Sequence, residues 1–114
     1  MNIAAVRGKL LREPTERTLG SGQRLVSFDV SIDSDDGPTE SVEVVWPDPP
    51  VNVFPRQGHE VFAIGRVRRR FFRTANGATV SRTELVAETV LTARQKSQIK
   101  RRLRDLAEVV SGEG

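Results

Sequence analysis

The sequence contains no cysteine and only one histidine, and each shortage excludes a class of chemistry. Without cysteine there is no disulfide framework, no thiolate metal site and no cysteine nucleophile. His59 has no second ligand of a suitable kind nearby, so no metal site is expected there. The segment DSDDG, residues 33 to 37, lacks the closing glutamate of a calcium loop and predicts an acidic connecting loop. We expect neither an enzyme, since no group is placed to do chemistry, nor a protein that holds a cofactor.

Long hydrophobic runs are also absent. Arg7 and Lys9 interrupt the apolar N-terminal stretch well before it reaches the length of a signal peptide or a membrane span. We therefore expect a cytoplasmic protein that does not bind membranes. A chain of 114 residues is long enough for one hydrophobic core and too short for two, which predicts a single domain with an appendage.

Charge is distributed unevenly along the chain. The net charge is only +3, but residues 33 to 60 hold seven acidic residues and one arginine, whereas the flanking segments are basic. Arginine outnumbers lysine fifteen to three, which suits phosphate binding and base stacking. A GC-rich genome would produce the same bias, so composition leaves both explanations open.

Alternating apolar residues predict a protein made mainly of β-strands. Apolar side chains occupy every second position from Val26 to Ile32, which indicates a half-buried strand. A weaker strand over residues 2 to 10 precedes it, and the segment LGSG supplies the turn between them. A third strand, ESVEVVW, begins at Glu40 and ends before Pro47, which cannot donate a ladder hydrogen bond. The prolines of the following segment, PDPPVNVFP, exclude a helix there.

Residues 65 to 86, GRVRRRFFRTANGATVSRTELV, predict a long and strongly basic hairpin. The dipeptide Asn76–Gly77 indicates a two-residue type I′ turn. It would connect a fourth strand that starts at Val61 to a fifth strand over residues 79 to 90. Five strands in this order favour a small β-barrel over a sandwich.

The turn decides which residues face each other across this hairpin. If Ala75 and Ala78 flank the turn, the expected pairs are Val67 with Val86, Arg69 with Glu84, Phe71 with Arg82 and Phe72 with Ser81. Each pair sets apolar against apolar, charge against opposite charge, or ring against guanidinium. Phe71 then points away from the face that Phe72 shares with its neighbouring arginines, which favours a structural role for Phe71.

A basic amphipathic helix is predicted after the last strand. Thr92 and Gln95 form a candidate capping box, and Gly112 is a candidate stop. The apolar stripe consists of Ile99, Leu103, Leu106 and Val110, and the surrounding cations are Lys96, Lys100, Arg101, Arg102 and Arg104. Such a helix can pack on the barrel, pair with a second chain or lie along nucleic acid. Its shortness favours docking on a protein surface over an independent coiled coil.

Two segments, NIAAVRGKLLREPTERTLGSGQRLVSFDVSI and GHEVFAIGRVRRRFFRTANGATVSRTELVAETV, share a pattern with a known family. The matching positions of the first are Asn2, Gly8, Leu10, Pro14, Glu16, Gly22, Val26 and Phe28. Those of the second are Gly58, Val61, Gly65, residues 68 to 73 and residues 83 to 86. With these residues in this order, the chain resembles the bacterial single-stranded DNA-binding proteins over residues 2 to 32 and 58 to 90.

The resemblance implies an oligonucleotide-binding (OB) fold, a five-stranded Greek-key barrel formed by residues 1 to 91, with residues 92 to 114 as helix and short tail. It also implies that bases stack on aromatic rings and that cations hold the phosphates. Phe72 takes the place of a hairpin tryptophan on which a base stacks. The candidate nucleic-acid contacts are Arg7, Lys9, Arg12, Arg24, Trp46, Arg66, Arg68, Arg70, Phe72 and Arg73.

Several of these residues have a second interpretation. Trp46 shares a strand face with Val42 and Val44, which favours the core or an interface, with base stacking as the alternative. Phe72 can pack on a neighbouring subunit, and any single cation of the first hairpin can be solvated surface. Phe28 is expected in the core.

Three features depart from the family pattern. Ser41 stands where the family usually has an aromatic residue, PDPPVNVFP replaces a short helix, and the chain ends in VVSGEG without an acidic tail. That tail recruits repair and replication enzymes in the family, so no such recruitment is expected. The chain is similar in outline to tailless primosomal binders, which assemble as dimers. We expect a homo-oligomer, either a dimer or a tetramer.

The sequence therefore predicts sequence-tolerant binding of single-stranded DNA in replication, recombination or repair. RNA is an alternative ligand, since nothing in the sequence addresses the 2′-hydroxyl. The alternative function is an interaction or assembly module that kept the barrel and binds DNA weakly or not at all. Ser41 and the missing tail favour that alternative.

Overall fold

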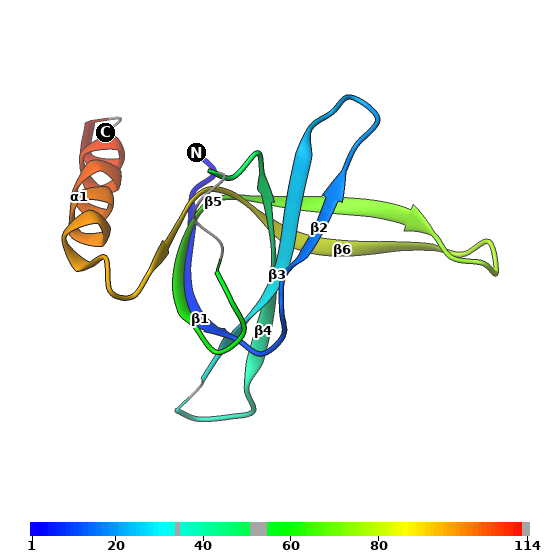
Figure 1. Ribbon diagram of the computed structural model, residues 1–114, viewed down its shortest axis with the longest axis horizontal. Coiled ribbons are helices and arrows are strands. Elements are labelled where there is room, and N and C mark those ends of the chain that lie inside the picture. The colour runs from blue at the N-terminus through cyan, green and yellow to red at the C-terminus, as the bar shows by residue number, and fades with distance from the viewer. Residues whose placement is uncertain (34, 51–54, 113–114) are drawn as a thin grey trace.

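The computed structural model describes residues 1–33, 35–50 and 55–112, and it shows a strongly curved sheet with one helix beside it (Figure 1). The strands are β1 (Ala4–Leu10), β2 (Thr15–Thr18), β3 (Arg24–Ile32), β4 (Glu40–Pro47), β5 (Glu60–Arg73) and β6 (Thr79–Thr92), and the helix α1 is Lys96–Gly112. No helix in this part of the chain is long and apolar enough to cross a membrane. The expectation for residues 51 to 54 of the proline-rich segment lies outside the described residues.

The sheet closes on itself to form a barrel. Its order is β1–β5–β6–β4–β3–β2, and the end of β1 also pairs with β3, which completes the ring. β4 and β6 run parallel, whereas the other neighbours are antiparallel. Since β1 and β2 both pair with β3, they are two parts of one bent arm, interrupted at residues 11 to 14. The predicted five-strand path, mainly β with a C-terminal helix, is confirmed.

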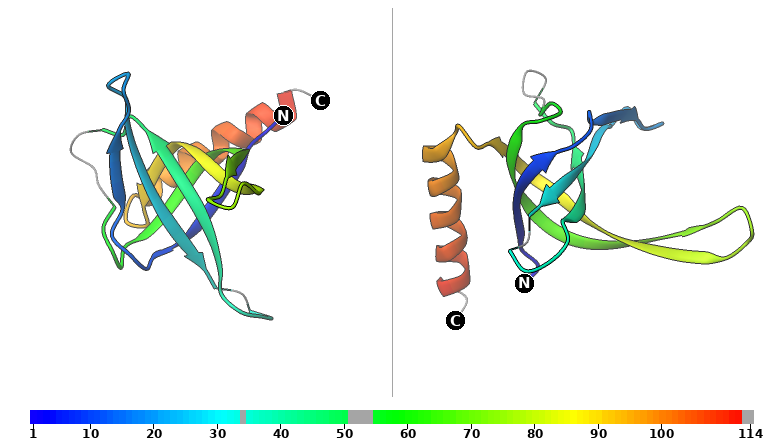
Figure 2. Two further views of the ribbon diagram at one scale, coloured as in Figure 1. Left: turned by 90° about the vertical axis from the view of Figure 1, so that its right-hand side faces the viewer. Right: turned by 90° about the horizontal axis from the view of Figure 1, so that it is seen from below.

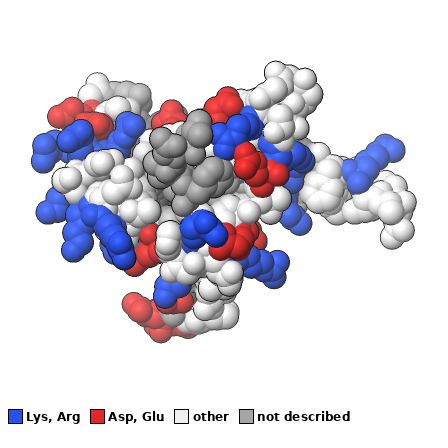
Figure 3. Space-filling view, viewed as in Figure 1, with Lys and Arg blue, Asp and Glu red and all other residues white. Residues whose placement is uncertain are grey.

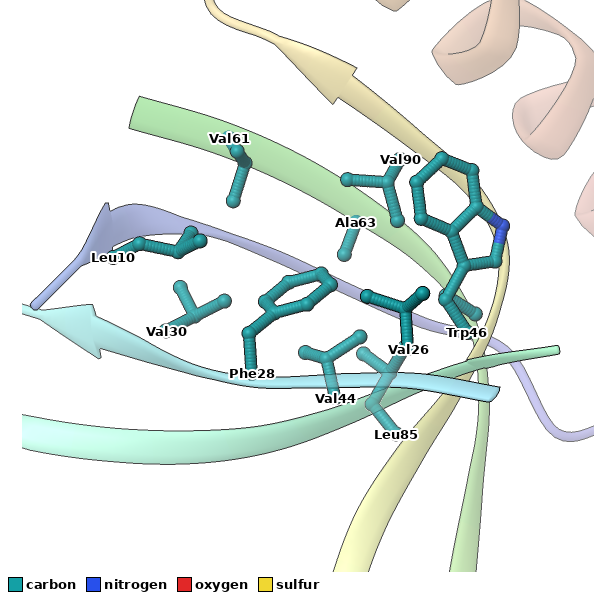
Figure 4. Packing of buried hydrophobic residues seen from close by; sticks show 11 residues of the cluster. Leu10, Val26, Phe28, Val30, Val44, Trp46, Val61, Ala63, Leu85 and Val90 are labelled. Atoms are coloured by element: carbon teal, nitrogen blue, oxygen red, sulfur yellow. The ribbon is translucent and has the colours of Figure 1, made fainter. Parts of the chain in front are cut away.

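Alternate side chains of the strands fill the barrel interior. Val26 and Val30 are fully buried and Phe28 is 5% exposed, which confirms the alternation predicted for this strand. Leu85 on β6 and Val61 on β5 reach the same cluster from the opposite wall (Figure 4). A single core therefore holds both halves of the barrel.

Trp46 belongs to this core, so its assignment as a candidate DNA contact is corrected. Its ring lies beside Val26 and Val90 (Figure 4) and only 4% of the residue is exposed. A base needs an open ring face for stacking, and the buried indole offers none. The shared strand face with Val42 and Val44 gave the right interpretation.

The β5–β6 hairpin differs from its predicted register by one residue. The backbone N–H of Thr74 donates to the carbonyl of Ala78 at 2.9 Å, so the loop has three residues rather than two. Gly77 has a φ of 81°, whereas Asn76 does not adopt a positive φ, which excludes the type I′ turn. A three-residue loop needs the left-handed conformation only at its last position, and glycine supplies it there.

The new register changes the partners across the hairpin. The observed pairs are Val67 with Leu85, Arg68 with Glu84, Arg69 with Thr83, Arg70 with Arg82, Phe71 with Ser81 and Phe72 with Val80. All four predicted pairs, Val67 with Val86, Arg69 with Glu84, Phe71 with Arg82 and Phe72 with Ser81, are therefore wrong. A one-residue slip moves the side chains of one strand to the other face of the ribbon. Arg82 and Glu84 of β6 now lie on the Phe72 face.

The helix α1 stands at the end of the barrel opposite the hairpin (Figures 1 and 2). The side chain of Gln95 accepts hydrogen bonds from the backbone N–H of Thr92 at 2.9 Å and from its hydroxyl at 3.3 Å. Because α1 begins at Lys96, these bonds close the turn before the helix, and the predicted capping box at its N-terminus is wrong. None of the helix residues that the structure describes is buried. Ile99 and Leu106 are half-buried whereas Leu103 and Val110 are exposed, so the predicted stripe is covered only in part.

Candidate nucleic-acid interface

A shallow groove crosses the outer face of the barrel next to the hairpin. Two adjoining hollows share Thr15, Ser27 and Glu43 as lining residues. One hollow extends to the base of the hairpin at Arg68 and Arg70, and the other extends toward Arg12 and Arg82. The groove therefore joins the strand faces to the basic hairpin, and both arginines and carboxylates line it.

Three acidic residues lie side by side across the outer face of the sheet in this region. Asp29 on β3 pairs with Glu43 on β4, which pairs in turn with Glu84 on β6. Like charges directly opposite each other destabilise a sheet unless cations neutralise them. The arrangement needs arginines nearby, and the hairpin supplies them.

Glu84 is the most deeply buried of the three, at 1% exposure, and it is held by Arg68. Its Oε1 accepts hydrogen bonds from Nε of Arg68 at 3.0 Å and from Nη2 at 2.5 Å. Its Oε2 is buried without a hydrogen bond, and Nε of Arg70 lies 3.9 Å away. Arg68 is therefore committed to a buried carboxylate rather than free for a phosphate.

Glu43 is neutralised in the same way from the hairpin. Nη1 of Arg82 donates to its Oε2 at 3.1 Å, and Nη2 of Arg70 lies 3.9 Å from its Oε1. Arg70 thus approaches two carboxylates without a close hydrogen bond to either. Arg82, which was not among the predicted contacts, could not have been found on this face with the predicted register.

Phe72 lies on the same face of the hairpin as these ion pairs. The guanidinium carbons of Arg70 and Arg82 are each 5.8 Å from the centre of its ring, and the residue is 38% exposed. These are cation–π distances. The predicted face shared by Phe72, Arg68 and Arg70 is observed, but a base that stacks on Phe72 has to compete with two guanidinium groups.

The opposite face of the hairpin is more open, and Arg73 is the one residue of it that was among the predicted contacts. Phe71 is 64% exposed and stands between Arg69 and Arg73 in the strand alternation. In the part of the chain that the structure describes, neither arginine forms an ion pair. The cross-strand partners of this face are the small hydroxyl residues Thr79, Ser81 and Thr83. The ring of Phe71 is therefore accessible and lies between two arginines, Arg69 and Arg73, that no carboxylate neutralises among the described residues.

The cations predicted from the first hairpin are placed differently. Nε of Arg7 contacts Glu60 and Nε of Arg24 contacts Glu16, each at 2.6 Å. Arg7 and Lys9 line another hollow, which shares no described lining residue with the groove. Of these four predicted contacts, Arg12 is the one that lines the groove. On the hairpin itself, Arg66 is exposed on β5.

Comparison with known proteins identifies the fold. No family model and no curated protein matches the sequence. Among solved structures, the chain is similar to Plasmodium falciparum SSB in complex with ssDNA, with a TM-score of 0.68 at 17% sequence identity. The match covers 81% of this chain and 94% of that one. The protein therefore has the OB-fold barrel that the sequence predicted, with a C-terminal helix added.

Proposed function

We propose that the protein binds single-stranded DNA without strong sequence preference and without catalysis. The observation that carries this proposal is the open hairpin face, where Phe71 is exposed between Arg69 and Arg73. Aromatic platforms flanked by cations are the usual means of holding a single strand irrespective of its sequence. The similarity to an SSB whose structure contains ssDNA supports the same proposal.

In this proposal the groove and the hairpin make different contacts with the single strand. The hairpin supplies stacking and phosphate contacts, and the apolar and hydroxyl side chains of the groove, among them Leu25 and Ser27, accommodate the strand farther along the barrel. We propose replication, recombination or repair as the process, the cytoplasm as the location, and a homo-oligomer as the active form. These assignments rest on the resemblance to bacterial single-stranded DNA-binding proteins.

A second candidate function has support of its own. The carboxylates of Asp29 and Glu43 lie in the groove and repel phosphates. A barrel with such a groove also suits an interaction or assembly module that binds protein and has weak or no affinity for DNA. RNA is the remaining alternative ligand.

The test is a titration of a fluorescently labelled oligothymidylate at several salt concentrations, with duplex DNA as competitor. We expect a preference for the single strand and an affinity that falls steeply with salt, because each phosphate contact releases counterions. Replacing both Arg69 and Arg73 by Ala should reduce the slope of log affinity against log salt by about 1.4, since each contact to a single strand contributes roughly 0.7.

A matched control is the double variant Arg94→Ala and Lys96→Ala, which removes the same charge beyond the end of β6 that is far from the hairpin. The slope should stay close to that of the unmodified protein. Equal slopes for both double variants would exclude the hairpin from binding. No binding of the single strand at low salt would favour the interaction module.

A further inference from the structure

The apolar stripe of α1 is only partly covered, with Ile99 and Leu106 half-buried. Leu103 and Val110 keep 45% and 55% of their surface exposed. The helix residues that line the hollow between α1 and β6 are Gln98, Arg101, Arg102 and Asp105. A polar face of the helix is thus directed at β6, and the stripe lies about a third of a turn from it, because successive residues are about 100° apart. Leu103 and Val110 are therefore available to a partner other than this barrel.

The charges of α1 are arranged in the opposite order to the one that the helix dipole favours. The first half, from Lys96 to Arg104, carries five cations and no acid, and the second half carries Asp105 and Glu108 and no cation. The first turn has no acidic residue and the last turn no basic one. A helix dipole favours the reverse arrangement. The layout is therefore unfavourable for the helix on its own, and a neighbouring helix must not place further cations beside its first half.

A second α1 packed antiparallel meets both requirements. With a two-fold axis between residues 104 and 105, Ile99 meets Val110 of the second copy and Leu103 meets Leu106, so the stripe matches itself layer by layer. The first half of each helix, with its five cations, then lies beside the second half of the other, which carries no cation. A parallel pair would instead set the five cations of each helix side by side.

We propose that α1 is a dimerisation helix, whose stripe of Ile99, Leu103, Leu106 and Val110 packs antiparallel against the same stripe of a second copy of this chain. Both copies use the same surface, so the assembly is a closed two-fold dimer. The helix stands opposite the hairpin (Figure 1), and Lys and Arg gather at the helix end of the molecule (Figure 3). Pairing through α1 leaves both hairpins free.

The first test measures the mass of the full chain by sedimentation in the absence of nucleic acid, so that the result does not depend on the proposed function. The unmodified protein should dimerise with increasing concentration, and Leu103→Glu should lower the measured mass. Ser97→Glu is the matched control, because it places the same new charge on the side of the helix away from the stripe, and its mass should equal that of the unmodified protein. Circular dichroism of both variants checks that the helix persists.

The second test uses the absence of cysteine to establish the orientation. Ile99→Cys and Val110→Cys are prepared separately, with one of them tagged, and then mixed under oxidising conditions. The antiparallel dimer predicts a disulfide between the two different variants and little cross-linking of either variant alone. Cross-linking of each variant with itself would show a parallel pair.

The proposal is overturned by a chain that stays monomeric at all concentrations, by an unchanged mass for Leu103→Glu, or by a mixture of cysteine variants that does not cross-link. A helix that serves nucleic acid instead would give a different pattern. Lys100→Glu with Arg104→Glu would then weaken binding of the oligonucleotide, and Leu103→Glu would leave the mass unaltered.

Discussion

Phe71 and Phe72 are adjacent in the chain, yet they occupy different environments. Phe72 is 38% exposed and has two guanidinium groups near its ring, whereas Phe71 is 64% exposed and faces Ser81 across the hairpin. Stacking requires an accessible ring face, and the cations near Phe72 are already drawn to Glu43 and Glu84. Phe71 is therefore the better platform for a base.

This difference predicts the effect of removing each ring. Phe71→Ala should weaken binding of an oligothymidylate by roughly 10-fold or more, since stacking on one ring is worth about 1 to 3 kcal/mol. Phe72→Ala should have the smaller effect on affinity and the larger effect on thermal stability, because its ring packs against two side chains. Fluorescence anisotropy and thermal unfolding of both variants provide the measurements. A larger affinity loss for Phe72→Ala would restore Phe72 as the platform.

The base of the hairpin depends on one buried ion pair between β5 and β6. Arg68→Ala would leave the carboxylate of Glu84, at 1% exposure, without its hydrogen-bond donor. We expect the free energy of unfolding to fall by roughly 2 kcal/mol, because a buried charged group that loses its partner keeps its desolvation penalty. Denaturant unfolding measures this change.

Arg66→Ala is the control for that experiment, since Arg66 is exposed on the same strand and forms no ion pair among the described residues. Its free energy of unfolding should change by no more than about 0.5 kcal/mol. The salt dependence of DNA binding should be the same for Arg68→Ala and the unmodified protein. A flattened slope with unchanged stability would identify Arg68 as a phosphate contact instead.

The same hairpin shows how far local sequence patterns reach. The alternation in β3, the existence of the hairpin and the positions of its ends were predictable, because each depends on neighbouring residues. The register was not, since Asn76–Gly77 is compatible with loops of two or three residues and only the φ of Asn76 distinguishes them. The one-residue difference in loop length moves Arg82 and Glu84 from the Phe71 face to the Phe72 face. This shift explains why carboxylates neutralise arginines on the predicted Phe72 face, and why Arg69 and Arg73 on the Phe71 face form no ion pair among the described residues.

The burial of Glu84 has a different origin and could not be read from the hairpin alone. Its neighbour on the other side is β4, a parallel partner that is far away in the sequence, and Glu43 lies opposite it there. The need for glycine at position 65 also depends on a neighbouring strand, since a Cβ at this position would collide with the carbonyl oxygen of Val86 across the strand pair. The family pattern marked this glycine, and the structure supplies the reason for it.

The long dimension of the molecule, 46 Å, has the helix at one end and the hairpin at the other (Figure 1). If the chain binds single-stranded DNA and pairs through α1, as proposed, the dimer carries two hairpins that project away from the shared helices. One strand long enough to reach both hairpins then binds its second site intramolecularly. A strand that reaches only one hairpin gains nothing from the dimer.

This arrangement predicts a length dependence that requires the helix. An oligothymidylate long enough to span both hairpins should bind at least about 10-fold more tightly than a short one, because the linked second site acts at a high effective concentration. Leu103→Glu should abolish the advantage of the long strand and leave the affinity for the short strand unchanged, since α1 and the hairpin lie at opposite ends of the molecule. Titrations of both oligonucleotides against both proteins measure the ratio. A ratio that persists in Leu103→Glu would mean that each barrel binds the whole strand on its own surface.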